Sequence, residues 1–176
     1  MCLDEINKVI ADYAQAYKHL NALQKKHADL LPKGDQKTGI IGEHYAPRYA
    51  QSIYGIAKFS KNSSQKGWDI QAENGGSTIK IQVKTVSAYS KTRAITPLYD
   101  GWDHLYLIHL NDDFKPDGFW ILLDDNHDLM KETNPPVTGL KMRDPNDHTS
   151  GSKVIWDNKS IQDKTKEMLA ILEAAK

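Results

Sequence analysis

Three polar residues near the middle of the chain have side chains that suit phosphodiester hydrolysis. Gln82 and Lys84 alternate with apolar residues in the segment IKIQVKT (residues 79–85), so in a strand they lie on the same face of the sheet. Asp69 belongs to the preceding segment WDIQAE, and the Asn-Gly-Gly sequence at residues 74–76 predicts a tight turn between the two segments. The resulting hairpin would bring a carboxylate, an amide and an ammonium group into one patch.

The same three side chains predict a magnesium site. Mg²⁺ prefers oxygen ligands, keeps several of its waters and takes one or two protein carboxylates. Asp69 would supply such a carboxylate, and the side-chain carbonyl of Gln82 would supply a further oxygen. A bound ion polarises a phosphoryl group and activates water. Lys84 would orient that water or offset the charge that builds on the phosphate.

The order and spacing of these residues resemble the PD-(D/E)xK nuclease superfamily, in its Gln-x-Lys variant. The pattern here is Gly67-Trp68-Asp69-Ile70 followed by Gln82-Val83-Lys84, with Trp68 in place of the family's proline and Gln82 in place of its second acidic residue. Members of this variant often add a glutamate from the helix before the strands, and Glu43 in the segment GIIGEHYA has that position. The resemblance covers residues 39–124.

This resemblance implies a fold, a cofactor and a function. The fold would be α/β, a restriction-endonuclease-like mixed β-sheet flanked by α-helices. The catalytic residues would be Glu43, Asp69, Gln82 and Lys84, of which Asp69, Gln82 and Glu43 would bind Mg²⁺, or Mn²⁺ in its place. The implied function is that of a Mg²⁺-dependent DNA endonuclease of the type II restriction kind, which hydrolyses phosphodiester bonds.

Two other functions are compatible with the residues alone. One is a catalytically inactive domain of the same fold that binds nucleic acid or another protein, and the neutral Gln82 in the metal site favours it. The other is an interaction protein that docks a partner through its first helix, and the net charge of zero favours it slightly. DNA binding without cleavage would indicate the first, whereas loss of function on deletion of the residues before Gly34 would indicate the second.

The loop after the strand of Lys84 offers groups for DNA contacts. Ser87, Tyr89, Lys91 and Arg93 carry hydroxyl groups and cations that suit phosphate oxygens, and such contacts position nucleic acid without reading its sequence. Seven Lys and Arg residues lie between residues 58 and 93 against two acidic residues, although the whole chain carries 23 of each sign. We therefore expect a local basic surface, with DNA as the partner.

Hydrophobic periodicity predicts the elements that position these residues. Apolar steps of three and four predict a long helix from Leu3 to about Leu31 and a second helix from Gly39 to Ile53, with Pro47 inside it. Strands are expected at WDIQAE, TIKIQVKTVS, HLYLIHL, FWILLD and KVIW. Ser160 and Asp163 predict the start of a closing helix in the style of a capping box.

Length and composition predict one domain. Residues 1–176 would form a single nuclease domain, with residues 1–34 as an N-terminal helix for dimerisation or DNA contact, 39–124 as the catalytic core and 159–175 as a C-terminal helix. The long first helix and the need to cut two strands favour a homodimer. A single cysteine, the lack of a secretory signal and the lack of an apolar run of about 20 residues predict a cytoplasmic protein that makes no membrane contact.

Overall fold

The described part of the chain forms an α/β arrangement in the computed structural model. The structure describes residues 3–26, 38–60, 67–123, 136–142 and 161–174. Within these residues a mixed six-stranded sheet is flanked by helices, which confirms the fold class expected from the sequence. In chain order the elements are α1 (Leu3–Lys26), α2 (Thr38–Tyr54), β1 (Ile56–Phe59), β2 (Ile70–Asn74), β3 (Ser77–Ser87), β4 (His104–Leu110), β5 (Pro116–Leu123), β6 (Ile161–Asp163) and α4 (Thr165–Ala174).

The strands lie in the sheet in the order of the sequence, from β1 to β6. The central strands β3 and β4 run parallel, and the other neighbouring pairs of described strands are antiparallel. The predicted β2–β3 hairpin is confirmed: it pairs Ile70 with Ile81. Its turn contains Gly75 and Gly76 with φ angles of 56° and 86°, a backbone region that glycine enters with little strain.

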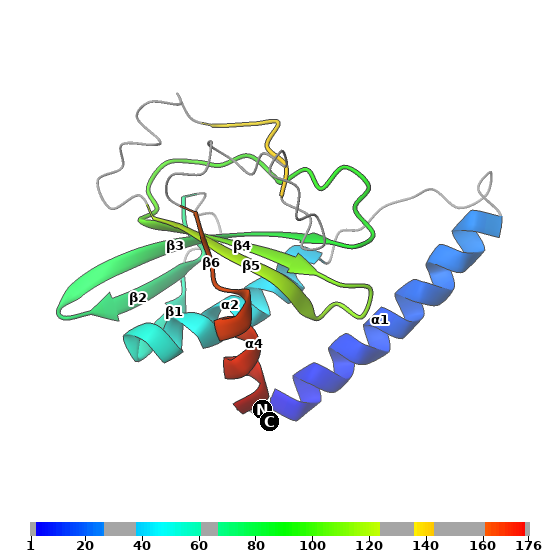
Figure 1. Cartoon of the computed structure of the whole chain (residues 1–176), viewed down its shortest axis with the longest axis horizontal. Helices are drawn as coiled ribbons and strands as arrows, with labels where there is room; N and C mark the ends of the chain where they lie inside the picture. Colours follow the sequence, from blue (N-terminus) through cyan, green and yellow to red (C-terminus); the bar gives the residue numbers. More distant parts are fainter. Residues whose placement is uncertain (1–2, 27–37, 61–66, 124–135, 143–160, 175–176) are drawn as a thin grey trace.

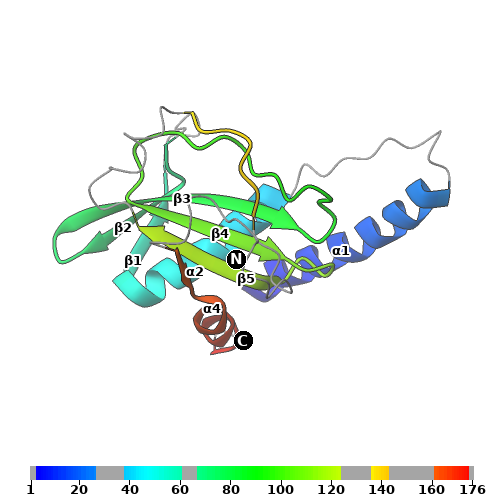
Figure 2. The same cartoon turned by 45° about the horizontal axis from the view of Figure 1, so that its top comes forward.

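The two faces of the sheet are covered by different kinds of structure. Helices α2 and α4 lie on one face, and residues 88–103 together with residues 136–142 lie over the other (Figures 1 and 2). These two covering segments are linked by bridges between Ala94 and Lys141 and between Leu98 and Val137. Because both faces are covered, all seven residues of β4 are buried, as the continuous apolar run HLYLIHL predicted.

The helical face holds the larger hydrophobic cluster. Tyr45 and Tyr49 of α2 pack there with Tyr106 of β4, Phe119 of β5 and Met168 of α4. Pro47 lies inside α2, as the sequence indicated, and is buried. The described helices include none that is both long and apolar enough to cross a membrane.

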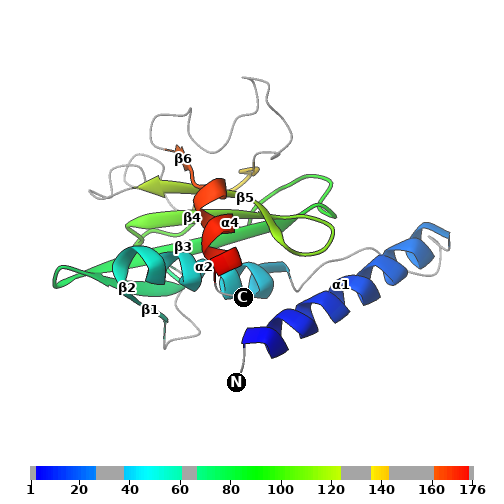
Figure 3. The same ribbon diagram turned by 60° about the horizontal axis from the view of Figure 1, so that its bottom comes forward.

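Helix α1 packs on the body along one stripe and extends past the edge of the sheet (Figure 3). Tyr13 and Tyr17 contact Phe114 in the turn between β4 and β5, with ring centroids 5.3 and 5.4 Å apart. Lys18 forms an ion pair with Asp113 of the same turn. The predicted continuation of this helix towards Leu31 lies outside the described residues.

Two short strands, β1 and β6, were not predicted. The capping-box prediction at Ser160 and Asp163 was wrong: residues 161–163 form β6, which pairs with β5, and α4 begins at Thr165. The Asp163 carboxylate accepts a hydrogen bond from the Thr165 N–H at 3.0 Å. Residues 161–163 form a strand because they pair with the edge of β5, and a local capping signal carries no information about that edge. The strand predicted at KVIW lies outside the described residues.

Candidate active site

The candidate site lies where β3 runs past the end of β2. Because β2 begins at Ile70, opposite Ile81, the ladder between the two strands stops there. Asp69 continues it in a different way: its N–H donates to the Ile81 carbonyl at 2.8 Å, and its carboxylate oxygen Oδ2 accepts from the Val83 N–H at 2.7 Å. The carboxylate of Asp69 is thus fixed against the edge of β3, next to Gln82.

Gln82 and Lys84 share the face of β3 that points away from α2. Their neighbours Ile81 and Val83 belong to the core cluster on the helical face, so alternation places Gln82 and Lys84 on the opposite face. Gln82 is nevertheless only 1% exposed, because residues 88–103 cover this face. The face of β3 that carries Gln82 is therefore a covered interior surface, and Lys84 lies half-buried beside Gln82.

Glu43 reaches the site from α2 because a glycine allows that helix to lie directly on β3. A Cβ atom placed on Gly42 would overlap Oγ1 of Thr85, so no larger residue fits there without movement of the strand or the helix. Glu43 follows directly and is half-buried. Its charge interacts with the charges of both Asp69 and Lys84.

The three ionisable groups perturb one another at this edge. Burial raises the pKa of Glu43, and the neighbouring charge of Asp69 raises it further, while Lys84 lowers it. Burial also raises the pKa of Asp69, against the opposing effects of the Val83 N–H and of Lys84. Burial lowers the pKa of Lys84, and the two carboxylates oppose that change. Two carboxylates and one ammonium group therefore share a partly desolvated site, in which a further cation would relieve the repulsion between the carboxylates.

The donor set fits a hard divalent cation. No group of three or more His, Cys, Asp and Glu side chains in the described residues could hold a metal ion. That excludes a closed zinc-type site from this part of the chain, but Mg²⁺ needs only one or two carboxylates and keeps its waters. Glu43 and Asp69 provide two carboxylates, and Gln82 provides an amide beside them.

Lys84 has a partner that the sequence did not indicate. Its Nζ donates a hydrogen bond to Oγ1 of Thr96 at 2.9 Å, and Thr96 belongs to the segment that covers this face of the sheet. The bond fixes the direction of the ammonium group at the edge of the site. Thr96 stands 12 residues after Lys84 in an irregular segment, and nothing in the local sequence ITP signals the contact.

The four residues predicted to contact DNA are not equally placed. Ser87 is 1% exposed, so it offers no surface to a phosphate in this structure. Tyr89 packs its ring against Tyr17 of α1 at 4.6 Å and donates its hydroxyl hydrogen to the Asp112 carbonyl. Lys91 is exposed and Arg93 is half-buried, in the loop that follows β3. Of the four residues, Lys91 and Arg93 are therefore the ones whose side chains could reach a phosphate from this loop.

Comparison with known proteins finds a likeness in structure and none in sequence. No protein-family model matches the sequence, and a search of curated proteins finds no relative. Among solved structures, the chain is similar to a bacterial homing endonuclease, I-Ssp6803I, with 15% sequence identity and a TM-score of 0.45. The similarity covers 81% of this chain and 96% of that one.

Proposed function

We propose that this protein is a metal-dependent DNA endonuclease of the type II restriction kind, built on the Gln-x-Lys variant of the PD-(D/E)xK site. The observation that carries the proposal is the convergence of Glu43, Asp69 and Lys84 at the edge of β3, where each of the three groups has a pKa shifted against its charged form by burial. Clusters of ionisable groups with perturbed pKa values are typical of functional sites.

Each residue has a role that follows from its position. Glu43 of α2 and Asp69 would hold Mg²⁺ at the edge of β3, where β2 ends, and the Gln82 amide would approach that edge from the covered face of the strand. When bound, Mg²⁺ would act as a Lewis acid on the phosphoryl group. Lys84, directed by Thr96 at 2.9 Å, would stabilise the negative charge that develops on the phosphate during attack by water.

The substrate that we propose is duplex DNA. Lys91 and Arg93 on the loop after β3 would contact the phosphate backbone beside the site, because both are cationic and lie on the same loop. A protein with one site cuts a duplex most simply as a symmetric pair, so we propose that it works as a homodimer.

The direct test is cleavage of plasmid DNA by the purified chain in Mg²⁺ and in EDTA. We expect metal-dependent conversion of supercoiled plasmid to linear or fragmented DNA, and its loss in Lys84→Ala. Lys166→Ala is the matched control, because Lys166 is an exposed lysine on α4, outside the basic segment of residues 58–93, and should leave cleavage unchanged. Equal cleavage by the Lys84→Ala variant would contradict the assignment of the site.

A second candidate is a binding domain that uses the same surface without catalysis. The neutral, 1% exposed Gln82 favours it, because an amide binds a divalent cation more weakly than a carboxylate. Such a protein would bind DNA equally well in Mg²⁺ and in EDTA and would leave the plasmid intact under both conditions. The substitution Gln82→Glu would then be the decisive variant. If the Gln82→Glu variant cuts the plasmid and the wild-type protein does not, the site is that of an inactivated nuclease.

A further inference from the structure

Helix α1 carries a second apolar stripe that the body of the protein covers only in part: Tyr13 packs against the core cluster, whereas Val9, Leu20 and Leu23 stay exposed. The first stripe includes Ile10, Ala14 and Tyr17, which pack against the larger core cluster. The second stripe follows a strict alternation of three- and four-residue steps, the pattern of a coiled-coil seam. Its members are Ile6, Val9, Tyr13, Ala16, Leu20 and Leu23.

Much of this seam is in solvent. Val9 is 61% exposed, Leu20 is 42% exposed and Leu23 is 50% exposed. Contiguous apolar side chains that stay exposed on a folded protein mark an interaction surface more often than single ones do. The seam lies on the flank of α1, beside the stripe that packs on the body, so it is accessible without any movement of the helix.

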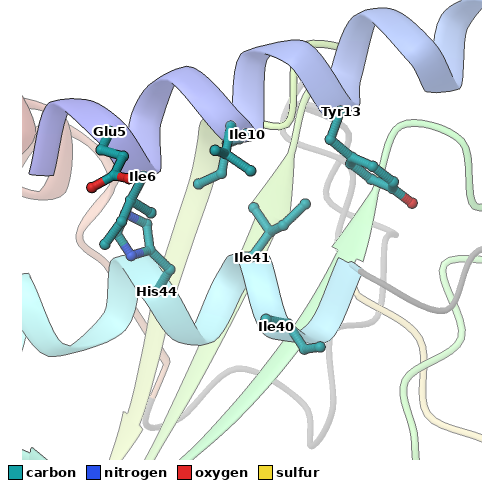
Figure 4. A pocket seen from close by; sticks show the side chains of 8 residues that line it. Glu5, Ile6, Ile10, Tyr13, Ile40, Ile41 and His44 are labelled. Carbon is teal, nitrogen blue, oxygen red and sulfur yellow. The ribbon is translucent and has the colours of Figure 1, made fainter. Parts of the chain in front are cut away.

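The N-terminal half of the seam borders a groove between α1 and α2 (Figure 4). The groove has a volume of about 480 Å³. Its walls are Ile6, Val9 and Ile10 of α1 and Ile40 and Ile41 of α2. Ile40 is 61% exposed, so the groove is an open apolar trough that a second helix could fill.

We infer that this surface binds a second copy of the chain, with the two α1 helices antiparallel. In the register set by the seam, Leu23 of the second copy faces Ile6, Leu20 of the second copy faces Val9, and Ala16 of the second copy faces Tyr13. The exposed leucines of each helix thereby enter the groove of the other copy. The two-fold axis repeats each contact, so two grooves and two pairs of leucines are covered at once.

The charges beside the seam specify the antiparallel direction. The residues that flank it on one side, at intervals of seven, are Glu5, Asp12, His19 and Lys26, all of them exposed. In an antiparallel pair these positions face one another, so Glu5 meets Lys26 of the second copy and Asp12 meets His19 of the second copy. A parallel pair would instead bring the acidic first halves of the two helices together.

This pairing specifies the surface and the direction of the homodimer proposed above, and it does not depend on nuclease activity. The seam and the groove use residues of α1 together with Ile40, Ile41 and His44 of α2, whereas the candidate site uses Glu43 of α2 and the edge of β3. A protein without nuclease activity would still form the pair. Mass measurements test the pairing, and plasmid cleavage tests the nuclease, so failure of one is distinguishable from failure of the other.

The first experiment is sedimentation velocity on the full chain and on Leu20→Glu/Leu23→Glu. We expect a dimer for the wild-type protein and a monomer for the double variant, with an unchanged far-ultraviolet circular dichroism spectrum. Leu169→Glu is the matched control, because Leu169 is 38% exposed on α4, away from the seam, and this variant should stay dimeric. A monomeric wild-type protein would overturn the inference and leave the groove to a different apolar partner. A dimeric double variant would overturn it by placing the interface elsewhere.

The second experiment tests the register through charge reversal. Glu5→Lys and Lys26→Glu should each raise the dissociation constant of the homodimer by about tenfold or more, because each places like charges opposite one another. When the two variants are mixed, the introduced lysine of one chain meets the introduced glutamate of the other. At the far end of the same helix pair, the native Lys26 of the first variant meets the native Glu5 of the second, so a heterodimer should form. Absence of the heterodimer, with both variants folded, would overturn the antiparallel arrangement.

Discussion

The two central strands of the sheet, β3 and β4, lie side by side and parallel, yet they place different kinds of side chain on the same face: polar on β3 and apolar on β4. On the face covered by residues 88–103, β4 presents Leu105 and Leu107, which are fully buried. At the same registers β3 presents Gln82 beside Leu105 and Lys84 beside Leu107. A buried amide and a partly desolvated ammonium group cost more free energy to bury than leucine side chains do, so Gln82 and Lys84 stabilise this layer less than Leu105 and Leu107.

The contrast supports the proposal made above, in which β4 serves the fold and β3 carries the catalytic residues. Desolvation lowers the pKa of Lys84, so its charged form is held there at a free-energy cost that the carboxylates of Asp69 and Glu43 only partly offset. Residues that reduce stability in this way are expected where activity needs them. Three substitutions would break or sharpen this contrast, and a fourth tests the part of α2 that carries Glu43.

The largest expected effect is on stability, at Leu107. The substitution Leu107→Ala removes a fully buried side chain from the cluster with Trp102 and Trp120, and we expect it to lower the free energy of unfolding by about 2–5 kcal/mol. Chemical denaturation followed by tryptophan fluorescence measures this change. At a temperature where the variant stays folded, its cleavage rate should remain close to that of the wild-type protein; a large loss of activity there would contradict the division between the strands.

The matching substitution on β3 should have the reverse effect. Lys84→Met keeps the length of the side chain but removes its charge, and we expect plasmid cleavage to slow by about 10²–10³-fold. The free energy of unfolding should stay constant or rise, since a desolvated ammonium group is replaced by an apolar one. Lys166→Met on α4 is the control for the loss of one positive charge. A variant that loses stability and activity together would assign Lys84 to the fold.

A smaller effect is expected at the contact between α2 and β3. Gly42→Ala adds a Cβ atom that overlaps Oγ1 of Thr85, which forces α2 away from the strand and should lower the free energy of unfolding by about 1–3 kcal/mol. Because Glu43 is the next residue, cleavage should fall as well. Gly39→Ala is the control, since no atom lies within 4 Å of the added Cβ. The double substitution Gly42→Ala/Thr85→Ala should recover part of both losses; no recovery would mean that this contact does not position Glu43.

The smallest effect concerns pH and His44, which lies beside Glu43 in α2. Burial, with a further contribution from the Arg48 guanidinium, lowers the pKa of His44 from 6.5 to about 4. Nη2 of Arg48 lies 2.7 Å from Nε2 of His44, which fits a neutral imidazole ring whose Nε2 accepts a hydrogen bond from the guanidinium group. The unfolded chain therefore binds a proton below pH 6.5 that the folded chain does not bind until about pH 4, so stability is full above pH 6.5 and falls as the pH drops towards 4.

Thermal denaturation of the wild-type protein and of His44→Gln at about pH 7.5 and about pH 5 isolates this contribution. Between these pH values the wild-type protein should lose a few degrees more in Tm than the variant, a modest difference because the ring is only half-buried. Equal losses in the two proteins would show that His44 is not held neutral. This measurement concerns His44 and Arg48 of α2 and not the histidines of β4, His104 and His109.

The sequence by itself determined the features that depend on neighbouring residues. Alternation in IKIQVKT and the Asn-Gly-Gly turn specify the β2–β3 hairpin, and the continuous apolar run of HLYLIHL specifies a strand buried on both faces. These patterns are local, because strand periodicity and turn chemistry act over a few residues. They also placed Gln82 and Lys84 on one face before any tertiary contact was known.

Only the tertiary structure decided what covers each face and which distant groups meet. Residues 88–103 fold back over β3, which buries Gln82 and brings Thr96 to Lys84. Close approach of α2 to β3 at Gly42 brings Glu43 near Asp69. Residues 161–163 pair with the edge of β5 and form β6, where the sequence predicted the start of a helix. These outcomes depend on contacts between residues far apart in the chain, which hydrophobic periodicity cannot encode, because it specifies that a face is buried and not which segment buries it.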